Sequence, residues 1–256
     1  MTTLFHAAHG AGPDIVLVHG WGLHGGVWSS LAPALASHYR VTVVDLPGHG
    51  RSPALARDAN IDAYADELAT TMPSPAIWVG WSLGATILLR MSRRHPQNIQ
   101  RLVLVGATPR FIRCENWPWG QDAEVLEAFG RELSLSYRAT LQRFLSLQLG
   151  SEGDLRVPVK QMRRELLRYG APDPVALQAG LSILRDTDLR TSLSQINVPC
   201  QVIHGTHDRL VPVAAGEFLA SRLPFARQDL LQSAGHAPFL SHPGAFQNVL
   251  ENFLRG

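Results

Sequence analysis

The sequence predicts an α/β protein in which a mostly parallel sheet is flanked by helices on both faces. Short apolar runs rich in β-branched residues alternate with stretches of helical periodicity, and this alternation is typical of parallel sheets. Most of these runs end in Gly, Asp, Ser or His, the small or polar types found where strands meet a binding site. We expect strands at 14–20, 39–48, 76–82, 101–107 and 200–206, and helices at 28–39, 61–72 and 83–96.

The alternation of strands and helices stops at about Pro109 and resumes at about Asp188. Between these points the sequence has only helical periodicity, over 122–134, 136–150 and 158–170. We therefore expect a single domain spanning 1–256 that carries a helical cap insertion at about 110–187. This cap insertion should lie over the carboxyl edge of the sheet.

Composition narrows the class of protein. In a chain of 256 residues, 45% hydrophobic and 17% charged residues are typical of a globular protein that buries a large core. A net charge of +2 does not favour nucleic acid as a partner. The chain has no apolar run near the roughly 20 residues that span a bilayer. Its two cysteines, Cys114 and Cys200, have no metal-ligand spacing. We expect a cytoplasmic monomer without a membrane segment, metal or organic cofactor.

The pentapeptide Gly80-Trp81-Ser82-Leu83-Gly84 joins a predicted strand to a predicted helix. Such a G-x-S-x-G turn pushes the serine side chain out of the sheet, and glycines let the strand and helix approach closely. The helix that begins at Leu83 directs its first amides toward the same place. Ser82 is therefore the candidate nucleophile. The structural alternative is a tight turn with a buried serine.

A serine nucleophile needs a base and an acid that orients the base. His236 follows the last strand-like run, 227–233, and Asp208 lies in the loop after the strand at 200–206, which gives the chain order Ser, acid, His. Asp229 lies inside a strand and Asp45 precedes the serine, so both fit the acid's place less well.

The oxyanion of the tetrahedral intermediate requires two backbone N–H donors. One should be the N–H of Leu83. The other should be that of Trp21, in the glycine-rich stretch 19–28 after the first predicted strand. We interpret His19 in this stretch as a structural, hydrogen-bonding residue, since it lacks partners at metal-ligand spacing.

The motifs "HGWG", "DLPGHGRS", "GWSLG", "HGTHDRLVP" and "AGHAPFLSHP" occur in an order that resembles the α/β-hydrolase superfamily along nearly the whole chain. Within it, "HGWGLHGGVW", "AIWVGWSLG", "RFLSLQ" and "HAPFLSHP" are similar to the pimeloyl-acyl-carrier-protein methyl ester esterases of biotin synthesis. The match is looser in the cap insertion.

The resemblance implies a carboxylesterase that cleaves the methyl ester of a pimeloyl chain carried on acyl carrier protein. Ser82, Asp208 and His236 match the family's triad. Trp21 and Leu83 match its substrate-contacting positions beside the nucleophile. The family's acyl-channel segment corresponds to Phe144, Leu145, Ser146, Leu147 and Gln148. Ala139 stands where the family places an arginine of the carrier-docking surface.

The cap insertion itself suits a lipid-like chain and an acidic carrier. Phe144, Leu145 and Leu147 could line a channel for a methylene chain; the alternative is that they only pack the insertion onto the sheet. From Arg138 to Arg168 there are seven cations and three acids, an excess that favours a phosphopantetheine-bearing partner but could be a solvated helix face. The candidate docking residues are Arg143, Arg156, Lys160, Arg163 and Arg164.

Two rival functions follow from the same residues. The first is a general short-chain carboxylesterase, or another α/β-hydrolase activity with the same triad. The second is a non-catalytic receptor that uses the hydrolase cavity to bind a small molecule. A triad that meets in space would favour an enzyme over a receptor.

Overall fold

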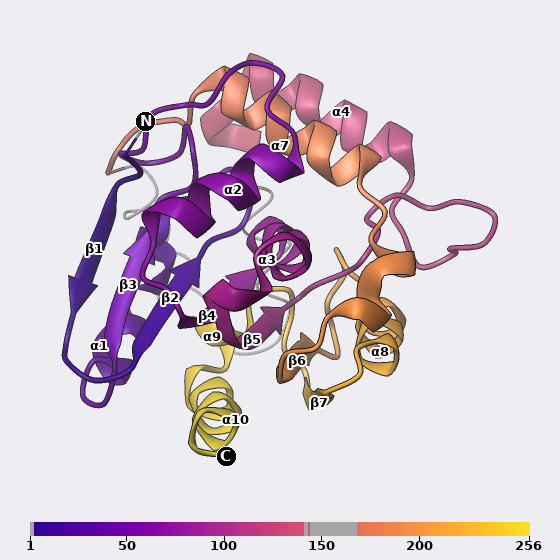
Figure 1. The fold of residues 1–256 in the computed structure, drawn as a ribbon. Helices are drawn as coiled ribbons and strands as arrows, with labels where there is room; N and C mark the ends of the chain where they lie inside the picture. The colour runs from indigo at the N-terminus through magenta and orange to yellow at the C-terminus, as the bar shows by residue number, and fades with distance from the viewer. Residues whose placement is uncertain (1–2, 141–142, 144–167) are drawn as a thin grey trace.

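The computed structural model describes residues 3–140, 143 and 168–256 of the chain. Within these residues a seven-stranded sheet has the order β1-β3-β2-β4-β5-β6-β7 (Figure 1). Strand β1 pairs antiparallel with β3 and all other pairs are parallel. The strands are β1 (His6–His9), β2 (Asp14–Val18), β3 (Arg40–Val44), β4 (Ala76–Trp81), β5 (Ile99–Val105), β6 (Cys200–Gly205) and β7 (Ala226–Leu231).

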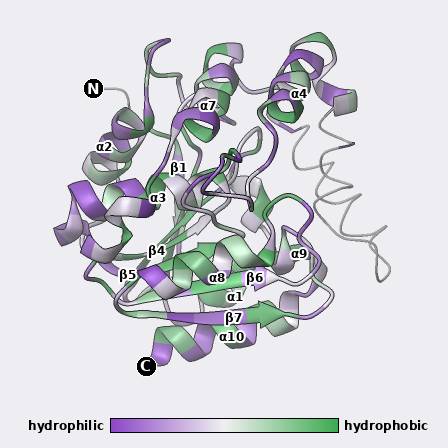
Figure 2. Ribbon diagram, turned by 90° about the vertical axis from the view of Figure 1, so that its right-hand side faces the viewer, coloured by the Kyte–Doolittle hydropathy of each residue, from purple (hydrophilic) through white to green (hydrophobic). Residues whose placement is uncertain are grey.

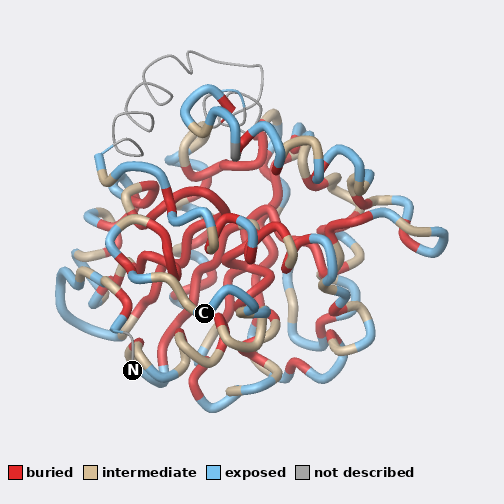
Figure 3. The backbone as a smooth tube through the Cα atoms, turned by 90° about the horizontal axis from the view of Figure 1, so that it is seen from above, coloured by how far each residue is buried: buried red, intermediate tan, exposed pale blue. Residues whose placement is uncertain are grey.

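The sheet separates two apolar cores because successive side chains of a strand point to opposite faces. In β2, Val16 and Val18 belong to one core, while Ile15 and Leu17 belong to the other. Buried residues accordingly run through the middle of the molecule, with exposed residues around them (Figure 3). Apolar residues concentrate in the strands, and the surrounding helices have mixed faces (Figure 2).

Helices cover both faces of the sheet. Core residues of α2, α3 and α8 pack on one face, and those of α1, α9 and α10 on the other. None of the helices within the described residues is long and apolar enough to cross a membrane. The α-helices are α1 (Leu31–Leu35), α2 (Ile61–Thr71), α3 (Leu83–Arg94), α4 (Ala123–Leu135), α7 (Pro174–Asp186), α8 (Val213–Arg222), α9 (Pro238–Ser241) and α10 (Pro243–Arg255).

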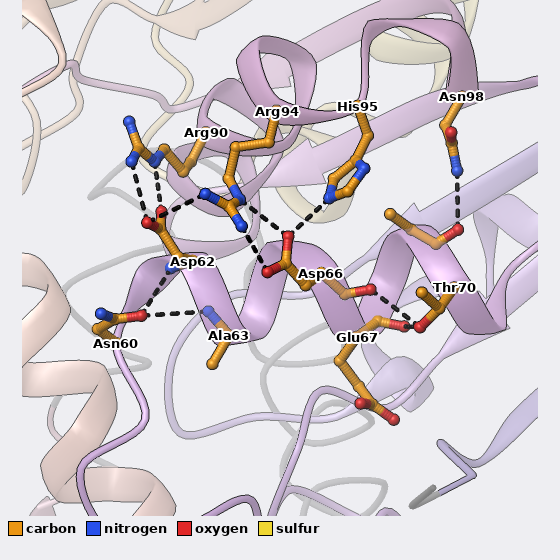
Figure 4. A network of polar contacts seen from close by, with 11 residues as sticks. Asn60, Asp62, Ala63, Asp66, Glu67, Thr70, Arg90, Arg94, His95 and Asn98 are labelled. Carbon is orange, nitrogen blue, oxygen red and sulfur yellow. Dashed lines mark hydrogen bonds and ion pairs between the residues drawn. The ribbon is translucent and has the colours of Figure 1, made fainter.

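A polar network fastens α2 to α3 on the outside of the sheet (Figure 4). Arg94 donates to Asp66 at 2.6 and 2.8 Å, and His95 contacts the same carboxylate at 2.6 Å. Arg90 forms a two-point ion pair with Asp62. The hydrogen bonds from Arg94 and His95 hold the pKa of Asp66 at about 2, although burial opposes them. The network holds the C-terminal half of α3 against α2.

The cap insertion contributes α4 and α7, which pack side by side at the top of Figure 1. Its two ends meet where Arg110 and Asp188 form an isolated β-bridge and an ion pair of 2.8 Å. The predicted helix at 122–134 corresponds to α4. Most of the predicted helix at 136–150 and nearly all of that at 158–170 lie outside the described residues.

The predicted strands are confirmed, and their ends differ from the prediction by no more than four residues. Helices α7 and α8 were not predicted as separate elements. Two further differences lie near the N-terminus. Strand β1 was not expected, because its four residues, His-Ala-Ala-His, have no apolar run. The helix expected over 28–39 is shortened to α1, Leu31–Leu35, because the chain turns there and enters β3 at Arg40.

Candidate active site

Ser82 occupies a strained turn between β4 and α3. Its φ of 55° and ψ of −120° are unusual for a residue with a side chain, and the strain is held by a 3.0 Å hydrogen bond from its N–H to the Val105 carbonyl. A Cβ on Gly84 would lie 2.5 Å from the His19 carbonyl oxygen, and one on Gly80 would lie 2.8 Å from the backbone of Ala85. Both glycines of the pentapeptide therefore permit the close approach that the sequence predicts.

Asp208 and His236 form a buried pair at the carboxyl ends of β6 and β7. The His236 Nδ1 lies 2.7 Å from Asp208 Oδ2, and both side chains are fully buried. The other carboxylate oxygen, Oδ1, accepts the N–H groups of Leu210 at 2.9 Å and Val211 at 2.8 Å. Burial alone would raise the pKa of Asp208, but His236 and the hydrogen bonds lower it well below its usual range. The carboxylate is therefore ionised and fixes the ring of His236.

His236 is anchored to the residue that precedes the serine. The Trp81 indole, one residue before Ser82, donates to the His236 carbonyl at 2.8 Å. Gly106, next to the Val105 that binds the serine N–H, has a φ of 54°, and a Cβ there would lie 3.0 Å from the His236 ring. The ring nitrogen Nε2 is buried and has no hydrogen-bond partner within the described part of the chain. It is available to take a proton.

The loop after β2, which carries Trp21, passes close to Ser82. Strands β2 and β4 are neighbours, with Val18 opposite Gly80, and a Cβ on Gly20 would lie 3.3 Å from the Cβ of Ser82. This is the point where strand order reverses, since β3 lies on the other side of β2. Loops diverge at such a point and leave a crevice for a ligand.

His19 fixes the direction of the Trp21 N–H. Its Nε2 accepts the Leu46 N–H at 2.8 Å, so the proton is on Nδ1, which donates to the Gly20 carbonyl at 2.7 Å. The Gly20 carbonyl and the Trp21 N–H belong to one planar peptide unit and point in opposite directions. Burial lowers the pKa of His19 to about 3, which keeps the ring neutral. The interpretation of His19 as a structural residue therefore fits its contacts.

Asp45 belongs to a polar cluster that supports this loop. Its buried carboxylate accepts the Gly25 N–H at 2.7 Å and pairs with Arg51 at 2.9 Å. His49 Nε2 accepts the Gly22 N–H at 3.3 Å, and burial lowers the pKa of His49 to about 4. Asp45 thus supports the loop and lies away from the pair of Asp208 and His236.

Side chains of the cap insertion reach the loop from above. The Trp21 indole donates to the Leu177 carbonyl of α7 at 2.9 Å and contacts the ring of Phe129 of α4 at a tilt of 55°, with ring centroids 5.4 Å apart. The Tyr137 hydroxyl donates to the Gly22 carbonyl at 3.1 Å. The position of the cap insertion is therefore coupled to that of the loop.

An apolar cavity of about 370 Å³ opens above Ser82. Trp21, Phe129 and Leu126 are among its walls, and Arg143 and Glu132 form an ion pair on its lining. The volume is within the range of small-ligand sites. Five residues predicted to line the acyl channel lie outside the described residues: Phe144, Leu145, Ser146, Leu147 and Gln148. Four of the candidate docking residues lie there too: Arg156, Lys160, Arg163 and Arg164.

Several residues at the site were not predicted from the sequence. Tyr137 and Phe129 are ordinary members of amphipathic helices in the sequence, and their contacts with the loop cross more than a hundred positions of the chain. His204 lies beside Asp208, with its Nε2 3.4 Å from Oδ2. Its place in the motif "HGTHDRLVP" was the only signal for it. Among the described residues, no group of three or more His, Cys, Asp or Glu side chains is arranged to hold a metal ion.

Comparison with known proteins agrees with the fold. Residues 13–243 match the family described as alpha/beta hydrolase fold. A pimeloyl-[acyl-carrier protein] methyl ester esterase from Nitrosomonas europaea is 41% identical over 252 residues, covering 98% of this chain and 99% of the relative. One from Chromobacterium violaceum is 43% identical over 251 residues, covering 98% of each chain.

Solved structures share the architecture. An esterase from Exiguobacterium antarcticum superposes with a TM-score of 0.90 at 22% identity, covering all of both chains. A bromoperoxidase from Bacillus anthracis gives 0.89 at 25% identity, covering 99% of this chain and 95% of the other. The sequence relatives are far closer in identity than these folds. The chain belongs to the α/β-hydrolase family and, within it, to the group of the pimeloyl-[acyl-carrier protein] methyl ester esterases.

Proposed function

We propose that this protein is a serine carboxylesterase that hydrolyses the methyl ester of pimeloyl-acyl carrier protein in biotin synthesis. The observation that carries the proposal is the buried pair of Asp208 and His236, anchored beside the strained Ser82 under an apolar cavity. Full-length relatives at about 41–43% identity act on this ester by name. The reaction belongs to the cytoplasm, where carrier-bound acyl chains are built.

In the first step Ser82 Oγ forms a bond to the ester carbonyl carbon while its proton moves to His236 Nε2. The carbonyl oxygen becomes an oxyanion, which the N–H groups of Trp21 and Leu83 bind. The intermediate then collapses. Its bond to the methoxy oxygen breaks, and that oxygen takes the proton from His236 to leave as methanol.

In the second step a water molecule attacks the acyl-enzyme, and His236 Nε2 takes one of its protons. The bond between Ser82 Oγ and the acyl carbon breaks, and the proton returns to the serine. The product is the free carboxylate of the pimeloyl chain, still on its carrier. Asp208 stays ionised throughout and stabilises the imidazolium that forms twice in the cycle.

The cavity above Ser82 suits the methylene chain of this substrate. Trp21, Leu126 and Phe129 give it apolar walls, and Arg143 with Glu132 supplies its charged part. We assign the cavity to the acyl chain and Arg143 to the phosphopantetheine arm or the acidic carrier. A carrier would have to compete with Glu132 for this arginine, because the two residues already form an ion pair.

The decisive experiment measures hydrolysis of pimeloyl-acyl carrier protein methyl ester beside free methyl pimelate and p-nitrophenyl butyrate. We expect rapid cleavage of the carrier-bound ester, abolished by Ser82→Ala. Arg143→Ala should raise KM for the carrier-bound ester alone. Arg131→Ala is the matched control, since this exposed arginine of α4 pairs with Glu127 away from the cavity.

The other outcomes separate the rival functions. Cleavage of the small esters alone would support a general short-chain carboxylesterase and refute the carrier-bound substrate. A protein that cleaves none of the esters and fails to react with a serine-directed fluorophosphonate would be a receptor on the hydrolase fold.

A further inference from the structure

A second buried histidine contacts the carboxylate that orients His236. His204 is the fifth residue of β6, and its side chain is fully buried. Its Nε2 lies 2.8 Å from the Val211 carbonyl oxygen and 3.4 Å from Asp208 Oδ2. The same Oδ2 accepts the hydrogen bond from His236 at 2.7 Å. One carboxylate oxygen therefore lies between two imidazole rings.

The contacts of His204 define its tautomer. A carbonyl oxygen can only accept, so the Nε2 carries a proton and donates it to Val211. The Nδ1 is buried and, within the described residues, has no hydrogen-bond partner. Helix α8 packs on this side of the ring, where a Cβ on Gly216 would lie 2.5 Å from Nδ1. An apolar ring would fill this space without leaving a buried nitrogen unpaired.

The charged groups that face His204 favour its protonation. They are Asp208, in the loop after β6, and Glu217 on α8, with His236 beyond the shared carboxylate. Burial lowers the pKa of His204, but the close contact with the Asp208 carboxylate, the Val211 carbonyl and Glu217 raise it above its ordinary value. A proton on His204 would put a second cation next to the carboxylate that serves His236.

We propose that His204 and His236 bind protons as a coupled pair through the shared Asp208 carboxylate, so that His204 sets how strongly His236 holds the proton taken from Ser82. His204 is then a positioning residue that acts through Asp208. Two groups that interact in this way titrate in shared macroscopic steps. Because like charges oppose each other, a protonated His204 weakens His236 as a base. The proposal rests on the catalytic roles assigned above to Asp208 and His236.

The pH dependence of kcat/KM for p-nitrophenyl butyrate tests this coupling in His204→Gln. Glutamine can still donate to the Val211 carbonyl but does not titrate. We expect the acidic limb of the profile to move up by roughly 0.5 to 1 pH unit, because His236 no longer shares its carboxylate with a second cation. His207→Gln is the matched control, since His207 is exposed in the same loop. Its profile should be that of the wild type.

An unchanged acidic limb in His204→Gln, or a fall in kcat without any shift, would reduce His204 to a packing residue and overturn the proposal. Should the variant fail to fold, NMR titration of the histidine rings in the wild-type protein decides. Coupled steps at His204 and His236 support the proposal, and independent titration overturns it. Neither readout uses the carrier-bound ester, so failure of that substrate assignment would be seen separately.

Discussion

Substituting Gly180 by alanine should reduce turnover with little loss of stability. A Cβ at this position of α7 would lie 2.7 Å from Trp21 Nε1 and 3.3 Å from Leu83 Cδ2, and closer still to Trp21 Cδ1. Carbon atoms in contact need about 3.5 Å, so the indole must move by about 1 Å. That movement breaks the 2.9 Å hydrogen bond to the Leu177 carbonyl and disturbs both residues assigned to the oxyanion.

The two effects on stability oppose each other and leave a net loss of about 0–2 kcal/mol. A buried indole N–H without a partner costs about 1–3 kcal/mol, whereas alanine in place of glycine inside a helix gains about 1 kcal/mol. Removing an oxyanion donor outright lowers kcat on the order of 10²–10³-fold, so a displaced donor should lower it about 10- to 100-fold.

Steady-state hydrolysis of p-nitrophenyl butyrate and urea unfolding at pH 7 give the two readouts. Gly244→Ala is the matched control, because a Cβ at Gly244 of α10 meets nothing within 4 Å. It should leave kcat unchanged. Wild-type kcat in Gly180→Ala would refute the idea that α7 positions the oxyanion loop through Trp21.

Two further predictions concern the cap insertion and the outer network. Tyr137→Phe removes the hydroxyl that donates to the Gly22 carbonyl, so we expect kcat to fall several-fold at constant KM and stability to fall by about 1 kcal/mol. Tyr39→Phe, in the connection between α1 and β3, is the control, and equal effects in both variants would contradict the coupling. Arg94 and His95 lower the pKa of Asp66 from 3.8 to about 2. The stability that this carboxylate gives the folded protein is therefore fully present above the pKa of the unfolded chain and is lost as the pH falls toward 2. The difference in unfolding free energy between wild type and Asp66→Asn, measured by urea unfolding, should therefore be constant from pH 7 to 5 and decrease below pH 4. A difference that stays constant down to pH 3 would mean that the network does not act through this charge.

The sequence was informative wherever local periodicity and strand ends determine position. In a parallel sheet the carboxyl ends of all strands lie at one edge, so residues that follow predicted strands, such as Ser82 and Asp208, could be expected to lie near each other. The chain order of the motifs then selected His236. Asp45 also follows a predicted strand. The one signal in the sequence against Asp45 as the catalytic acid was that it precedes Ser82 in the chain.

The remaining contacts depend on packing between segments far apart in the chain. The Trp81 indole reaches the His236 carbonyl across 155 positions, and the Tyr137 hydroxyl reaches Gly22 across 115. No periodic pattern specifies such pairs. Gly180 looks like an unfavourable residue inside a helix until the Trp21 ring is seen against it. Strand β1 could not be predicted because an edge strand can be short and polar, without the apolar pattern that identifies a buried strand.

Two buried histidines near the site, His19 and His49, accept a hydrogen bond at one ring nitrogen and donate one at the other. His19 accepts from Leu46 and turns the Gly20 carbonyl, and with it the Trp21 N–H. His49 accepts from Gly22 while its other nitrogen lies 2.9 Å from the Pro47 carbonyl. Both have pKa values lowered by burial, so neither exchanges a proton near neutral pH. The effect of Asp45 on His19 and His49 does not overcome burial, whereas Asp208, whose Oδ2 lies 3.4 Å from His204 Nε2, raises the pKa of His204 together with the Val211 carbonyl and Glu217. The carboxylate that acts on His204 is also the one that orients His236.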